Sequence, residues 1–164
     1  MSSEKIIQYN KIDLIERDAL ALNKIEEIIG KPLSEVEEIE RETIGIKAKD
    51  NKVVGLGLFK QGLTELPKSV CDLLDLELLW IRYNKMSVLP ESISQLSKLE
   101  KINCVGNPLT TLPESIGKLK NLTHIYCVLT EITELPDSIC DLPNINQLWV
   151  EFGPLEELPE NIGN

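Results

Sequence analysis

Leucine and proline recur along most of this chain with a period much longer than that of a helix or a strand. A Leu-Pro dipeptide recurs at a constant step of 23 residues, in five copies that begin at Leu66, Leu89, Leu112, Leu135 and Leu158. Valine or isoleucine follows each of these leucines four residues later. A constant period of about 20–50 residues is typical of repeat proteins, in which each unit buries its apolar face only by stacking on its neighbours.

The residues around each Leu-Pro follow one frame, L-x-x-L-x-L-x-x-N-x-L-x-x-L-P-x-x-I-x-x-L-x-x. The alternating L-x-L predicts a short strand with its leucines on one side and the intervening residues on the other. The proline half-way round ends regular structure and sends the chain back by another route. We therefore predict stacked coils whose strands form a parallel sheet, with five repeats at residues 53–75, 76–98, 99–121, 122–144 and 145–164.

This frame resembles the leucine-rich-repeat family, in its 23-residue intracellular form with an L-P-x-x-I segment. Similar arrays occur in Ras-suppressor-like, plant intracellular, bacterial and archaeal proteins. The resemblance covers residues 53–164 and implies an α/β fold, a right-handed solenoid with a parallel concave sheet. It also implies that the concave face is the binding surface.

The position after each strand is asparagine in two frames, at Asn84 and Asn107. A buried asparagine there can bond the backbone of neighbouring coils, which irregular buried backbone requires. Gln61, Thr130 and Gly153 replace it elsewhere. At those coils we expect poorer order, or water in place of the side chain.

Residues 1–52 do not fit the frame and are predicted to cap the first coil. Apolar residues at spacings of three and four indicate an amphipathic helix over residues 10–29. Gly30 and Pro32 then end this helix. Covering the exposed end of a solenoid is the usual role of such a segment. A separate helix that docks a partner is the alternative.

Two further elements are expected between this helix and the first repeat. Ser34 and Glu37 have the spacing of a capping box, which predicts a short helix through about Arg41. Residues 43–48 and 52–58 are predicted to form a β-hairpin that leads into the first repeat strand.

Aromatic residues are concentrated on the predicted concave face. The chain has seven, and six of them fall between or just after the strand leucines. Exposed aromatic side chains reduce solubility, and with arginine they are enriched at binding hot spots. Strand propensity, or packing of the aromatics on one another, is the alternative explanation. The candidate partner-binding residues are Phe59, Trp80, Arg82, Tyr83, Lys101, Asn103, His124, Tyr126, Trp149, Glu151 and Phe152.

The charged residues on this face indicate which kind of partner it binds. Lys60, Arg82, Lys101 and His124 form a basic margin on the N-terminal side of this face, and Glu151 is its only acid. We expect a protein or peptide partner that presents apolar groups and an acid. The formal net charge of −10 argues against binding to nucleic acid or to an anionic membrane, because both attract a basic face.

The sequence offers no catalytic, metal-binding or cofactor-binding motif. His124 is the only histidine, and the odd spacing to Cys127 on one strand places the two on opposite faces. Cys104 and Cys127 are expected in the core as small apolar residues. We therefore expect a protein that is not an enzyme. No apolar secretory segment opens the chain, so we expect reduced cysteines and a cytoplasmic location.

The fifth frame stops at Asn164, before its last leucine position. One interpretation is that the chain is the recognition segment of a larger signalling protein, such as one that joins repeats to a GTPase. The other is that the open end associates weakly, although the eight acids after Lys120 oppose this. We expect a monomer at low salt, with self-association rising as salt screens these acids.

Overall fold

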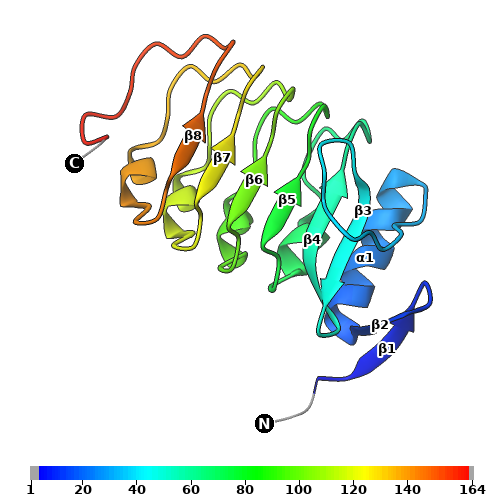
Figure 1. The fold of residues 1–164 in the computed structure, drawn as a ribbon. Coiled ribbons are helices and arrows are strands. Elements are labelled where there is room, and N and C mark those ends of the chain that lie inside the picture. Colours follow the sequence, from blue (N-terminus) through cyan, green and yellow to red (C-terminus); the bar gives the residue numbers. More distant parts are fainter. Residues whose placement is uncertain (1–3, 163–164) are drawn as a thin grey trace.

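The computed structural model describes residues 4–162 and consists of stacked coils with one continuous sheet (Figure 1). The sheet has six strands in the order of the sequence, and its first pair is antiparallel. The remaining neighbours are parallel, as the repeat predicts. The strands are β3 (Ile44–Lys49), β4 (Lys52–Leu58), β5 (Leu78–Trp80), β6 (Lys101–Asn103), β7 (His124–Tyr126) and β8 (Gln147–Trp149).

The register of the sheet follows the 23-residue period. Leu79 pairs with Ile102, Ile102 with Ile125, and Ile125 with Leu148, so equivalent frame positions lie side by side. On the far side of the coils, each proline of the first four Leu-Pro pairs immediately precedes a short 3₁₀ helix. These are η1 (Lys68–Asp72), η2 (Glu91–Gln95), η3 (Glu114–Lys118) and η4 (Asp137–Asp141).

The core lies between the sheet and the 3₁₀ helices and runs the length of the stack. The frame leucines Leu76, Leu99 and Leu122 are fully buried, and the same cluster includes Leu22 and Ile25 of the N-terminal helix. Burial of this apolar surface, at about 25 cal/mol per Å², is the main force that holds the coils together.

A ladder of asparagine side chains supports the turns that leave the strands. Asn84 Oδ1 accepts hydrogen bonds from the N–H groups of Gln61 and Leu63. Its Nδ2 donates to the carbonyls of Leu58 and Ile81, at 2.8 and 3.0 Å. The side chain therefore joins two coils through four backbone groups.

The ladder continues at Asn107 and then weakens. Asn107 Nδ2 donates to the carbonyls of Ile81 and Cys104. In the fourth coil, Thr130 Oγ1 donates only to the Cys127 carbonyl. A threonine hydroxyl has one proton to donate, so it cannot serve two coils as the amide does.

The N-terminal helix begins later than the sequence predicted. α1 spans Glu16–Ile29, whereas residues 10–15, expected to be helical, belong to a hairpin of β1 (Ile6–Tyr9) and β2 (Ile12–Ile15). Asn10 and Lys11 turn this hairpin with positive φ values of 43° and 75°. The apolar spacing fits both structures over these few residues, and pairing between the two short strands decides the outcome.

The short helix expected from Ser34 to about Arg41 is absent; that prediction was wrong. The Ser34 carbonyl accepts a hydrogen bond from the Ile46 N–H, and the Val36 N–H donates to the Ile46 carbonyl. The segment is therefore extended and lies along the outer edge of β3. An uncovered edge strand has unpaired backbone groups, so this contact satisfies groups that a local helix would leave bare. The predicted hairpin of β3 and β4 is present.

An ion cluster connects α1 to the first coils. The Asp75 carboxylate accepts from Arg17 Nη2 at 2.8 Å and from Lys98 Nζ at 2.6 Å, and Lys52 Nζ lies 3.5 Å away. The side chain of Asp18 is fully buried; it bonds Arg17 and accepts from the Val53 N–H. α1 also contacts η1, so it occupies the place that the 3₁₀ helix of a preceding coil would take.

The last coil is less covered than the others. Ile145, Leu148, Val150 and Leu155 are partly buried, and Leu158 is 57% exposed. The expected association through this end stays a prediction, and Asn164 lies outside the described residues. Within residues 4–162, no helix has the length and apolarity that a membrane span requires.

Candidate functional site

The exposed face of the sheet contains the aromatic row that the frame predicts. Trp80 pairs with Asn103, Asn103 with Tyr126, and Tyr126 with Trp149, so these residues cross β5 to β8 in one line. The ring centroids of Tyr126 and Trp149 are 6.2 Å apart, with an angle of 57° between the rings. Trp149 is 46% exposed, while Trp80 and Tyr126 are half-buried.

The sequence predicted that Asn103 is available to a partner on this face, but the structure buries it. It is only 7% exposed, and its Oδ1 accepts a hydrogen bond from the Val105 N–H at 3.2 Å. Asn103 lies between Trp80 and Tyr126 in the sheet. The hydrogen bond from the Val105 N–H takes the place of one from water. Asn103 therefore supports the turn after β6 and separates Trp80 from Tyr126.

The exposed face begins at β5, because the cap covers β4. A Cβ atom on Gly55 would lie 2.6 Å from Ile39 Cγ1, and one on Gly57 would lie 2.6 Å from the Thr43 carbonyl oxygen. The segment 39–43 thus packs directly on the outward side of β4, and only glycine leaves it room. Arg82 Nη1 holds this segment by donating to the Arg41 carbonyl at 3.0 Å. The glycines at both outward positions of β4 are the feature of the sequence that could have predicted this contact with residues 39–43.

Cations and aromatic rings gather where the first two repeat strands end. The rings of Phe59 and Tyr83 meet edge to face, with centroids 5.9 Å apart. Lys60 Nζ lies 5.0 Å from the Phe59 centroid and 5.6 Å from that of Tyr83, and Arg82 Cζ lies 5.3 Å from Tyr83. The Tyr83 ring also fills the space above Gly106, where a Cβ atom would lie 2.5 Å from it. Such cation–π contacts fix the positions of these side chains.

A second regular feature follows the strands, and the frame alone did not reveal it. At one frame position every coil has a residue with a left-handed backbone, and successive members are 23 residues apart. The N–H of each of the first four donates to a carbonyl of the next coil, which explains why the conformation recurs whatever the side chain. We call these residues the rim; they are Lys60, Tyr83, Gly106, Leu129 and Phe152.

A groove of about 480 Å³ lies between the aromatic row and the rim. Two arginines and no acid line it. Two buried donors at its cap end, Trp80 Nε1 and Arg82 Nε, have no hydrogen-bond partner among the described residues. The lining residues are Arg41, Trp80, Arg82, Tyr83, Asn103, Val105, Tyr126, Val128, Leu129, Gln147 and Trp149.

His124 and Lys101 lie side by side at the strand starts, as the sequence predicted. Partial burial, together with the charge of Lys101, lowers the pKa of His124, which favours the neutral imidazole. Its Nδ1 lies 2.7 Å from Thr123 Oγ1. Glu151 is exposed in the fifth coil, whereas Arg82, Lys101 and His124 belong to the second, third and fourth coils.

The cysteines occupy positions without access to this face. Cys104 and Cys127 are fully buried in neighbouring coils, whereas His124 is half-exposed on the sheet. The hydrogen bond to Cys127 and burial raise the pKa of the Cys104 thiol. A protonated, buried thiol is unreactive. Among residues 4–162, no cluster of three histidine, cysteine or carboxylate side chains is arranged to hold a metal ion.

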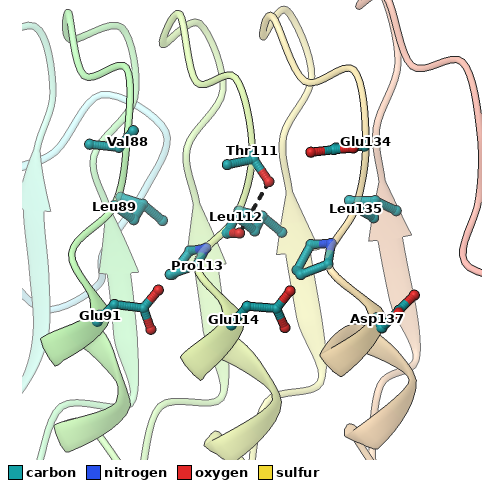
Figure 2. Close-up of a pocket in the computed structure, with 11 residues that line it drawn as sticks. Val88, Leu89, Glu91, Thr111, Leu112, Pro113, Glu114, Glu134, Leu135 and Asp137 are labelled. Carbon is teal, nitrogen blue, oxygen red and sulfur yellow. Dashed lines mark hydrogen bonds between the residues drawn. The ribbon is translucent and has the colours of Figure 1, made fainter.

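A second hollow, of about 490 Å³, lies along the Leu-Pro segments of the middle coils (Figure 2). Glu91, Glu114 and Asp137 occupy the same frame position, at the starts of successive 3₁₀ helices, as Figure 2 shows. Glu91 Oε2 accepts from the Ser115 N–H of the next coil, and the Glu91 carbonyl accepts from Ser115 Oγ. This carboxylate therefore connects two coils.

Comparison with solved structures places this geometry among known proteins. A leucine-rich-repeat protein of Leptospira interrogans matches 65% of the chain at 31% identity, with a TM-score of 0.63. A plant ice-binding protein matches 88% at 22% identity (TM-score 0.69). The BIR3–SERK2 complex from Arabidopsis thaliana matches 88% at 20% identity (TM-score 0.69). This chain folds as a leucine-rich-repeat solenoid.

This chain spans only part of the length of some of the proteins that it resembles. The chain spans 27% of the Leptospira protein and 50% of the ice-binding protein, but 87% of the matched chain in the Arabidopsis complex. No protein-family model matches the chain, and no curated protein sequence is significantly similar to it.

Proposed function

We propose that this leucine-rich-repeat unit is a non-catalytic interaction module that binds a protein or peptide partner on the exposed face of β5 to β8. The observation that carries the proposal is the row of Trp80, Tyr126 and Trp149, with Trp149 left 46% exposed. Tyrosine, tryptophan and arginine are the residues most enriched at binding hot spots. Packing within the row leaves much of this aromatic surface in water, so packing alone does not account for it.

The charges support a partner with apolar groups and an acid. Arg41 and Arg82 line the groove, and Lys101 lies beside it on β6. Nucleic acid and anionic membrane do not fit, because the whole chain has a formal net charge of −10. The cytoplasm remains our proposal for its location, in keeping with four cysteines that form no disulfide.

The small size of the face favours a peptide, or a place within a larger protein. Strands β5 to β8 at a spacing of about 4.8 Å span only about 14 Å. A standard interface buries about 800 Å² on each partner, which is more than this strip offers. A second candidate function is therefore the recognition segment of a longer signalling protein, in which neighbouring units enlarge the surface.

Replacing Trp149 with alanine is expected to weaken binding about 30-fold, or about 2 kcal/mol, because a large exposed aromatic is lost from the contact. The probe is a set of 12-residue peptides selected from a random displayed library on the intact chain, and affinity is measured by fluorescence titration. Trp80 also borders residues 39–42 of the cap, so Trp149 tests binding with less effect on stability.

Val88→Ala is the control, since Val88 is 53% exposed but lies away from the sheet face. It should leave affinity unchanged. If the selected peptides bind Trp149→Ala and the Trp80→Ala/Trp149→Ala double variant as tightly as the original chain, the proposed binding face is wrong.

A further inference from the structure

We infer that the rim residues Leu129 and Phe152, together with Trp149, anchor the partner, and that an extended partner segment runs along the stack with its carboxylate at Arg82. This inference rests on the proposed function and adds to it the anchor, the direction of the segment and the spacing of its groups. Three independent features of the molecule support it.

The first is the conformation of the rim. Leu129 and Phe152 have φ values of 57° and 55°. The left-handed region favours glycine or asparagine and is unfavourable for large side chains. In the third coil the same position is occupied by glycine, Gly106, with a φ of 72°. Strained residues of this kind are concentrated at ligand-binding sites.

The second is exposure without internal packing. Tyr83 occupies the same rim position and is 39% exposed, but its ring contacts Phe59, Gly106 and two cations. Phe152, by contrast, is 79% exposed, and Leu129 is 48% exposed. The N–H of Leu129 donates to the Glu151 carbonyl, so the fold accounts for the backbone at this position, but it does not account for large apolar side chains left in water at two adjacent coils.

The third is the chemistry at the other end of the groove. Arg41 and Arg82 line the groove and no acid does. Arg82 is half-buried and lines the groove; its Nη1 donates to the Arg41 carbonyl, and its Nε is buried without a partner among residues 4–162. A carboxylate is the acceptor that a guanidinium binds best, through two parallel hydrogen bonds. Glu40 and Glu42 border Trp80 on the cap side, outside the groove lining.

The distance between the two ends sets the spacing in the partner. Arg82 follows β5 and Phe152 follows β8, so they are three strand spacings apart, or about 14 Å. An extended chain rises about 3.3 Å per residue. The segment should therefore carry its acidic residue and its large apolar residue about four positions apart.

The test uses the intact chain and the displayed library of random 12-residue peptides. On the original chain we expect selected peptides to share an aspartate or glutamate about four positions from a tryptophan, phenylalanine or leucine. On Arg82→Glu the acid should disappear from the selected peptides while the apolar residue remains. On Leu129→Asn/Phe152→Asn, peptides selected on the original chain should bind at least tenfold more weakly.

Thermal denaturation separates binding from folding. Asparagine tolerates a left-handed backbone, and the replaced side chains of Leu129 and Phe152 are 48% and 79% exposed. The double rim variant should therefore melt within about 2–4 °C of the original chain, or above it. Val88→Asn, at an exposed apolar position far from the groove, is the matched control and should leave peptide binding unchanged.

Several outcomes would overturn the inference. These are selected peptides without the acid–apolar spacing, no enriched peptide at all, or full affinity in the double rim variant. Full affinity in the rim variant with loss in Trp149→Ala would overturn the anchor but leave the proposed function. A dimer in sedimentation that the rim variant abolishes would show that a second copy of the chain, and not a peptide segment, occupies the rim.

Discussion

Replacing Asn84 with alanine is expected to lower the free energy of unfolding by about 3 kcal/mol. Its amide serves the N–H groups of Gln61 and Leu63 and the carbonyls of Leu58 and Ile81, all on two neighbouring coils. Asn84 is 5% exposed, so water cannot replace these bonds without opening the turn. Each buried backbone group left unpaired costs about 1–3 kcal/mol before relaxation. Urea denaturation followed by circular dichroism measures the loss.

Thr130 provides the matched comparison at the same frame position. Its hydroxyl makes one hydrogen bond, to the Cys127 carbonyl, so Thr130→Ala should cost only about 1 kcal/mol. Equal losses at the two positions would contradict the ladder, because they would show that the number of backbone bonds does not set the stability of a coil.

Replacing Asp75 with asparagine is expected to cost about 2–3 kcal/mol at neutral pH and almost nothing near pH 2. Burial alone raises the pKa of Asp75, but hydrogen bonds from Lys98 and Arg17 and the charge of Lys52 outweigh it and lower the pKa to about 2. The side chain of Asp75 is 9% exposed, so solvent screens these contacts little.

The sign of the pH dependence follows from this lowered pKa. The ionised carboxylate stabilises the folded chain above the ordinary pKa of 3.8, and that contribution is lost as the pH falls towards about 2. Asp18 acts in the opposite direction, since burial raises its pKa and protonation then favours the folded state. Both the original chain and Asp75→Asn contain Asp18. Its contribution therefore cancels, to first order, in the difference between their free energies of unfolding.

Chemical denaturation at pH 7, 4 and 2.5 measures this difference. The exposed pair of Lys47 and Glu38 is the control, because the Glu38 side chain is 67% exposed and Glu38→Gln should change stability by less than about 0.5 kcal/mol at any of these pH values. A loss in Asp75→Asn that stays constant from pH 7 to pH 2.5 would show that its shape, and not its charge, joins α1 to the repeats.

The repeats could be predicted from the sequence because their interactions are local and periodic. Leu79, Ile102, Ile125 and Leu148 share one frame position, and the same spacing brings them into register in the sheet. Each coil contacts mainly its neighbours, so the period by itself determines the stacking, the parallel sheet and the line of Trp80, Tyr126 and Trp149.

The secondary structure of the N-terminal cap could not be predicted from local sequence patterns, because contacts between distant segments determine it. Residues 34–36 are extended because the edge of β3 offers them hydrogen-bond partners, although Ser34 and Glu37 have the spacing of a helix start. The hairpin of β1 and β2 likewise takes residues 12–15 out of the helix. Backbone groups at an exposed sheet edge are satisfied by whichever segment reaches them, and that depends on the folded chain.

The candidate site was decided partly by sequence and partly by the tertiary structure. The frame determined which side chains point away from the core, and so it identified Trp149 and Tyr126. Only the folded chain places residues 39–43 over β4, buries Asn103 between aromatic neighbours and leaves Phe152 exposed. The physical reason is that a repeat pattern specifies the direction of a side chain, whereas its exposure depends on what distant segments pack above it.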